Sequence, residues 1–85
     1  MINQLKQHVS KTSCPYNLGE KPTLEIEQEG KLMYIDFEID EDGFTYVNEC
    51  YAQSESNPDE INHLNKSEVK DVLDEWISWS YENVN

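Results

Sequence analysis

The chain has 85 residues, of which 18 are Asp or Glu and six are Lys, so its formal net charge is −12; no Arg is present. This balance excludes direct binding to nucleic acid or to an anionic membrane, because both need basic side chains to neutralise phosphate. It favours a basic, Lys/Arg-rich protein surface or a cation as the partner. Aromatic residues make up 11% of the chain, which indicates one folded domain over residues 1–85.

The compartment is predicted from two features. Neither the first ten residues nor any later stretch contains the apolar run of a signal peptide or of a membrane span, which needs about 20 residues. Cys14 and Cys50 are isolated, whereas a small secreted scaffold usually carries more cysteines. We therefore expect a cytoplasmic protein with free thiols.

The first predicted element is a helix over residues 2–11. Ile2, Leu5 and Val9 follow the spacing of one helix face and form a narrow apolar stripe. The Cys14-Pro15 pair ends it, because the residue before proline avoids the helical region. Residues 12–22 are then a connector.

Three strands follow, over residues 23–28, 32–40 and 44–52, with apolar and polar residues alternating. Glu29-Gly30 and Asp42-Gly43 are predicted two-residue turns, since glycine accepts the positive φ that such turns require. The second turn pairs Ile39 with Tyr46 and brings Phe44 to the core. The face predicted to be buried comprises Leu24, Ile26, Met33, Ile35, Phe37, Ile39, Phe44, Tyr46, Cys50 and Ala52.

Residues 53–65 are polar and predicted to be a loop, and the last helix runs from Lys66 to Asn83. Asn65 caps it, with Glu68 three residues later. The order predicts an α+β fold of the form α-β-β-β-α: a three-stranded antiparallel meander with two helices packed on one face. Double-stranded-RNA-binding domains have the same order, but the basic residues they need are missing here. The predicted buried stripe of the helix is Val69, Val72, Leu73, Trp76, Ile77 and Ser80.

The open face of this sheet is the first candidate site. Residues two apart on a strand lie about 6.7 Å from each other and neighbouring strands about 4.8 Å apart, so its carboxylates form a lattice at phosphate-like spacing. The alternative is that these acids only confer solubility. The predicted binding residues of this face are Glu25, Glu27, Tyr34, Asp36, Glu38, Asp40 and Glu49, with Tyr51 among them.

The outer face of the last helix is the second candidate. It carries Asp71, Asp74, Glu75 and Glu82, which would extend an acidic surface around the domain. An acidic, solvated helix face is also ordinary. Trp79, at the edge of the buried stripe, either packs in the core or anchors an interface.

The same residues include candidates for a metal site and for catalysis. Residues 38–49 resemble an EF-hand calcium loop, with Gly43 at the sharp turn and Glu49 as the last ligand. The pattern departs from it at Glu38 and Thr45, and strand-like flanks replace the helices, so a hairpin is preferred. No zinc-ligand spacing, phosphate loop or catalytic motif is present. We therefore expect no cofactor, no metal and no enzymatic activity.

The resulting functional hypothesis is an acidic inhibitor that mimics nucleic acid and occupies the DNA- or RNA-binding groove of a nuclease-type enzyme. In size and charge the chain resembles the small phage proteins that block restriction or CRISPR nucleases, which act in the host cytoplasm. The first alternative is an immunity protein or antitoxin that caps a basic toxin. The second is a divalent-cation-binding protein similar to frataxin, although frataxins carry their acids on the first helix, and here that helix carries Lys6 and Lys11.

Overall fold

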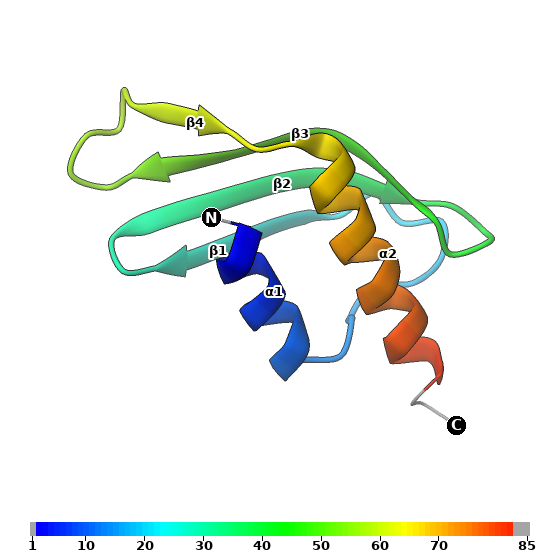
Figure 1. Cartoon of the computed structure of the whole chain (residues 1–85). Coiled ribbons are helices and arrows are strands. Elements are labelled where there is room, and N and C mark those ends of the chain that lie inside the picture. The colour runs from blue at the N-terminus through cyan, green and yellow to red at the C-terminus, as the bar shows by residue number, and fades with distance from the viewer. Residues whose placement is uncertain (1, 83–85) are drawn as a thin grey trace.

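The computed structural model describes residues 2–82 and has two layers (Figure 1). An antiparallel sheet of order β1-β2-β3-β4 forms one layer, and α1 and α2 cover one of its faces. This confirms the α+β class and the position of both helices. The predicted Asn83 and the side chain of Glu82 lie outside the described part of the chain. The elements are α1 (Ile2–Lys11), β1 (Thr23–Gln28), β2 (Lys31–Ile39), β3 (Thr45–Ser54), β4 (Ile61–His63) and α2 (Lys66–Glu82).

The fourth strand corrects the predicted three-stranded meander. β4 pairs antiparallel with β3 through residues 51–53, in a segment that the sequence predicted to be a loop. It has three residues, all exposed, and is too short for an alternation of apolar and polar residues to mark it. Its pairing depends on the turn before it, where Gln53 Nε2 donates to Pro58 O (2.6 Å) and Glu60 N donates to Asn57 O (3.0 Å).

The connector between α1 and β1 is bound to α2 by hydrogen bonds from both directions. Trp76 Nε1 donates to Thr12 O (2.6 Å), and Cys14 N donates to Ser80 Oγ (2.8 Å). Tyr16 packs edge-on against Phe37, at 5.9 Å between ring centroids, and against Trp76. These contacts join the two helices to each other and to the sheet.

The first hairpin matches its prediction. Gln28 pairs with Lys31, and both Glu29 (φ 53°) and Gly30 (φ 74°) have positive φ, as a two-residue type I′ turn requires. Ile26 therefore lies opposite Met33 as expected. The side chains of Leu24, Ile26, Met33, Ile35, Phe37 and Ile39 are all buried.

The second hairpin differs from its prediction near the turn. Ile39 pairs with Thr45, so the connection has five residues, and Asn48 is bulged to restore the predicted pairing of Ile35 with Cys50. Between the loop and the bulge, each residue of β2 pairs one residue earlier on β3 than predicted. Thr45 and Val47 are therefore buried, whereas Phe44 and Tyr46 are 59% and 68% exposed, and their predicted place in the core is wrong.

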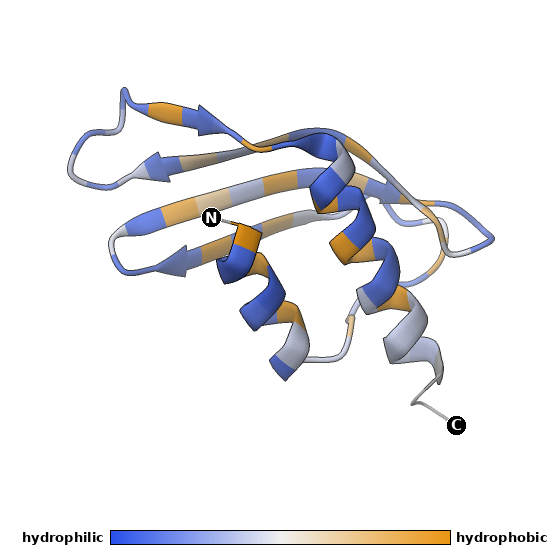
Figure 2. Ribbon diagram, in the orientation of Figure 1, coloured by the Kyte–Doolittle hydropathy of each residue, from blue (hydrophilic) through white to orange (hydrophobic). Residues whose placement is uncertain are grey.

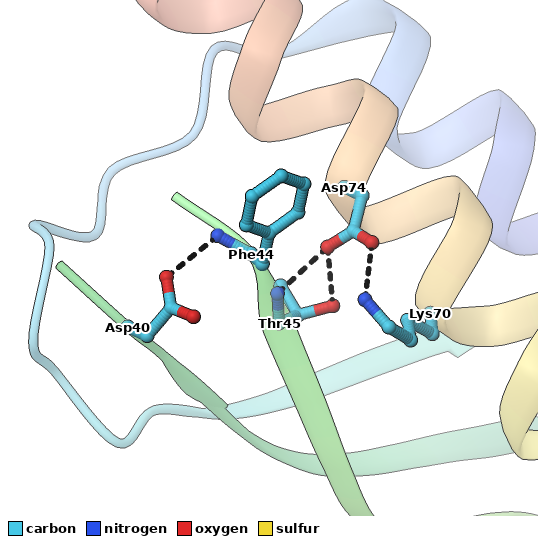
Figure 3. Close-up of polar contacts among 5 residues, drawn as sticks. All are labelled: Asp40, Phe44, Thr45, Lys70 and Asp74. Carbon is cyan, nitrogen blue, oxygen red and sulfur yellow. Dashed lines mark hydrogen bonds and ion pairs between the residues drawn. The ribbon is translucent and has the colours of Figure 1, made fainter. Parts of the chain in front are cut away.

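The wider loop has a local cause. Asp40 Oδ1 accepts a hydrogen bond from the backbone N–H of Phe44 at 2.9 Å, as Figure 3 shows. It accepts another from the backbone N–H of Asp42, also at 2.9 Å. Asp40 N also donates to Phe44 O (2.9 Å), and Gly43 takes a φ of 90°. An aspartate that closes a turn through its own side chain stabilises this loop over the two-residue alternative.

Helix α2 begins as predicted but uses one acidic residue differently. Asn65 Oδ1 accepts from Glu68 N (3.1 Å), which confirms the cap. Asp74, predicted to point outward, instead accepts from both Thr45 N and Thr45 Oγ1 at 2.7 Å, and pairs with Lys70 Nζ at 2.5 Å (Figure 3).

Asp74 points toward the sheet because a backbone N–H group there lacks a partner on the neighbouring strand. Both backbone groups of Ile39 bond to the connector, with Gly19 N donating to Ile39 O and Ile39 N donating to Glu20 O. The facing Thr45 N–H therefore has no partner on β2. Thr45 is buried, so this N–H needs another acceptor, and Asp74 supplies it.

We predict that Phe37→Ala lowers the free energy of unfolding by about 3–5 kcal/mol, because it empties the centre of the core. Phe44→Ala is the matched control. It removes an exposed ring whose described aromatic contact is Lys70 Nζ at 5.7 Å, and should change stability by less than about 1 kcal/mol. Urea titration of both variants measures the difference. Equal losses would contradict the observed register.

A second prediction concerns Asp74. Asp74→Ala leaves the buried Thr45 N–H and hydroxyl without their acceptor, and should lower the free energy of unfolding by about 1–3 kcal/mol. Asp71→Ala, on the exposed side of the same helix, should change it by about 0.5 kcal/mol or less. Urea denaturation followed by circular dichroism compares them, and an unchanged Asp74→Ala midpoint would contradict this role.

Candidate functional site

The open face of the sheet is the candidate site, and the alternation of the strands creates it. Hydrophobic and hydrophilic residues alternate along the strands, as Figure 2 shows, and the helices pack on the hydrophobic side. The polar residues of β1, β2 and β3 are thereby directed to the opposite side, which no described element covers.

Strand pairing arranges this face in rows that run across the sheet. One row contains Glu25, Tyr34, Tyr51 and His63, one residue from each strand. A neighbouring row contains Thr23, Asp36 and Glu49, and the row on the other side contains Glu27, Leu32, Gln53 and Ile61. The two tyrosines therefore occupy the middle of the face, with carboxylates in their own row and in both neighbouring rows.

The centre of the face is a stacked pair of tyrosines. The rings of Tyr34 and Tyr51 lie 5.0 Å apart at an interplanar angle of 22°. Both residues are half-buried, although no helix covers them, because each ring shields one face of the other. A parallel stack of this kind holds both side chains in one orientation at a solvent-facing position.

The carboxylates around the stack differ in how they are satisfied. Within residues 2–82, Glu25, Asp36 and Glu49 form no hydrogen bond or ion pair through their side chains, so their charge is available to a partner. Glu38 lies 3.7 Å from Lys21 Nζ and accepts a hydrogen bond from Asn48 Nδ2 at 3.2 Å.

The other predicted site residues lie elsewhere. Asp40 is in the hairpin loop, where its carboxylate holds backbone N–H groups. Asp74 is bonded to β3. Asp71 and Glu75 are exposed on the opposite side of the molecule, where they line a hollow between α1 and α2 together with Lys6. The structure thus brings together Glu25, Glu27, Tyr34, Asp36, Glu38 and Glu49, and it separates Asp40, Asp71, Asp74 and Glu75 from them.

Sequence reasoning missed Glu55, which joins the acidic face from beyond the end of β3. Its backbone N–H donates to Gly30 O at 2.9 Å. A hydrogen bond to Glu27 and the negative charge of that residue raise the pKa of the Glu55 carboxyl above its usual value. His63 and Ile61 were missed for a different reason, because β4 was not predicted. Their place on the face follows from the pairing of β3 with β4 and from no pattern in the sequence.

The candidate calcium loop lies in a hairpin, and the two cysteines are free thiols. Residues 38–49 form the β2–β3 hairpin, in which Glu49 pairs with Asp36 and not with the loop. Burial raises the pKa of the Cys14 and Cys50 thiols, which are not joined in a disulfide, and this disfavours the thiolate form. Among the residues described, no group of three or more His, Cys, Asp or Glu is arranged to hold a metal ion.

Trp79 is 43% exposed and lines a groove of about 440 Å³ between the two helices. The other described residues of this groove are Lys6, Val9, Ser10, Val72, Glu75 and Trp76. It lies on the side of the molecule opposite the acidic face, so it is not part of the candidate site.

The described helices include none that is both long and apolar enough to cross a membrane. Family models, curated proteins and solved structures give no significant match to this chain. The candidate site therefore stands on its geometry and charge alone.

The Glu27–Glu55 pair generates a prediction about pH. A carboxyl whose pKa is raised on folding favours the folded state below its unfolded pKa of about 4.3, and loses that contribution as pH rises through the folded value. Glu55→Gln should therefore raise the melting temperature at pH 7 and have little effect at pH 3. Glu60→Gln, an equal charge change at an exposed residue, is the control for general repulsion. Calorimetric scans at both pH values measure this; equal gains for the two variants would contradict the pairing.

Proposed function

We propose that the protein is an acidic inhibitor that mimics nucleic acid and occupies the basic DNA- or RNA-binding groove of a nuclease-type enzyme, in the manner of phage proteins directed against restriction or CRISPR systems. The observation that carries the proposal is an uncovered sheet face on which unpaired carboxylates surround a stacked aromatic pair. A phage-encoded inhibitor of this kind would act in the cytoplasm of the host cell.

The spacing of the charges supports this. Glu25 and Glu27 are two residues apart on β1, so their backbone positions are about 6.7 Å apart, and Asp36 and Glu49 are paired across a strand spacing of about 4.8 Å. Nucleic-acid phosphates lie at comparable distances, so a groove lined with Lys and Arg to receive phosphates can receive these carboxylates. Two such charges 6 Å apart repel by about 0.7 kcal/mol even in water, a repulsion that a basic partner removes.

The arrangement of charge favours the sheet over the helix as the binding face. Three acids of the sheet face have no internal partner among the described residues, whereas on α2 Asp74 is bonded to Thr45 and Lys70. Asp71 and Glu75 share their hollow with Lys6, which reduces the local negative potential. The sheet also presents its charges on one continuous surface.

A matched pair of charge-reversal variants tests the binding face. Glu25→Lys/Asp36→Lys and Asp71→Lys/Glu75→Lys each change the net charge by the same amount, on opposite sides of the molecule. The first should weaken inhibition of the target nuclease by about 3 kcal/mol, a hundredfold or more, since close charge pairs couple at about 1.5 kcal/mol each. The second should act only weakly. The measurement is inhibition across a panel of restriction and CRISPR nucleases, with melting curves to confirm folding.

Salt and competitor experiments separate mimicry from its alternatives. Association with a basic groove should slow steeply as salt rises, because it is steered electrostatically. The nuclease's own nucleic acid should compete with the inhibitor. Binding to a basic nuclease toxin that its nucleic acid does not displace would instead identify an immunity protein. Equal effects of both reversals would contradict the assignment of the sheet face.

A further inference from the structure

The tyrosine stack gives the acidic face a feature that carboxylates alone do not have. Resting on the function proposed above, we infer that the face is selective for arginine: the guanidinium group of a partner's arginine stacks on Tyr34 and pairs with the carboxylate of Glu25. The partner surface is therefore rich in arginine in preference to lysine.

Strand pairing places the Tyr34 ring and the Glu25 carboxylate side by side. Tyr51 covers one face of the Tyr34 ring, at 5.0 Å between centroids. Because β2 lies between β3 and β1, we infer that the other face of the ring is on the side of β1. The residue opposite Tyr34 on β1 is Glu25. Directly paired residues have their Cβ atoms about 4.5–5.5 Å apart. A flat group stacked on Tyr34 is thus within hydrogen-bonding reach of the Glu25 carboxylate.

Both the Glu25 carboxylate and the tyrosine stack are available to a partner's arginine. Within the described chain, Glu25 has no hydrogen bond or ion pair through its side chain, and it is exposed. The stack is pre-formed, so binding does not require the rings to be ordered first. Asp36 and Glu49, in the adjacent row, add two further unpaired carboxylates beside the stack.

The geometry distinguishes arginine from lysine. A guanidinium is planar, is weakly hydrated at its faces and donates in the plane of the group, so it can stack on a ring and donate two parallel bonds to a carboxylate at once. A lysine ammonium is a compact, strongly hydrated charge without a flat face, so it cannot stack on a ring and donate two parallel hydrogen bonds to a carboxylate at once. The second face of the stack, on Tyr51, is directed toward His63, which has no negative charge, so the Tyr34 side is the favoured position.

A second copy of the chain does not fit this role. The protein contains no arginine, and most of its charge is negative, so two open faces would repel each other. Nucleic acid is disfavoured by the same charge. An arginine-bearing protein segment is the occupant that matches both the stack and its carboxylates.

The test uses two peptides of equal length and charge, octa-arginine and octa-lysine, with affinity measured by calorimetry and the site located by NMR. The wild-type protein should bind octa-arginine about five- to tenfold more tightly. Tyr34→Leu/Tyr51→Leu should remove this preference while leaving the affinity for octa-lysine nearly unchanged. Tyr34→Phe/Tyr51→Phe keeps both rings and should keep the preference. Tyr46→Leu, on the same face but outside the stack, should also keep it.

Each outcome is decisive. Equal affinity for the two peptides in the wild type, or a preference that persists in the folded Leu double variant, overturns the arginine inference. Either result leaves the proposed function intact if both peptides still bind with strong salt dependence to the sheet face. Loss of binding to both peptides contradicts the basic-partner function as well. If the Leu double variant does not fold, Glu25→Gln replaces it and should lower the affinity for octa-arginine more than the affinity for octa-lysine.

Discussion

Burial of one side of the central strand β2 beneath the layer formed by the two helices is the contact on which the rest of the structure depends. Met33, Ile35, Phe37 and Ile39 are at most 2% exposed, and α2 packs its apolar stripe over the same layer. Because strand side chains alternate, burying this set directs Tyr34, Asp36 and Glu38 to the other side. Each helix has only one apolar stripe, so the described chain has no element left to cover the open face.

The charge of that face acts against folding, and under the proposed function it favours binding of a basic partner. A domain of 85 residues has a thin stability margin, and closely spaced carboxylates repel one another in the folded state more than in an extended chain. The pKa of Glu55, raised by a hydrogen bond to Glu27 and then by the negative charge of that residue, is the local sign of this crowding. A basic partner that binds only the folded protein relieves the repulsion and stabilises the fold by mass action.

The β2–β3 hairpin connects the core to the site. The Asp40 loop pairs Ile39 with Thr45 in place of Tyr46, and the bulge at Asn48 corrects this register shift of one residue. Between loop and bulge the side chains exchange sides, so Tyr46 joins the open face and Thr45 enters the core. Asp74 then satisfies the buried polar groups of Thr45, which connects α2 to the sheet at this point.

The sequence by itself determined the α+β class, both helices, the first hairpin and most of the acidic face, because these follow from local periodicity and turn residues. Tertiary structure alone decided the register of the second hairpin. The Asp40 loop and the two-residue turn give strand pairings that differ by one residue, and a bulge absorbs this difference. Tertiary structure also decided the direction of Asp74 and the pairing of β4. Those depend on which backbone groups another strand leaves unpaired, and a one-dimensional pattern does not record that.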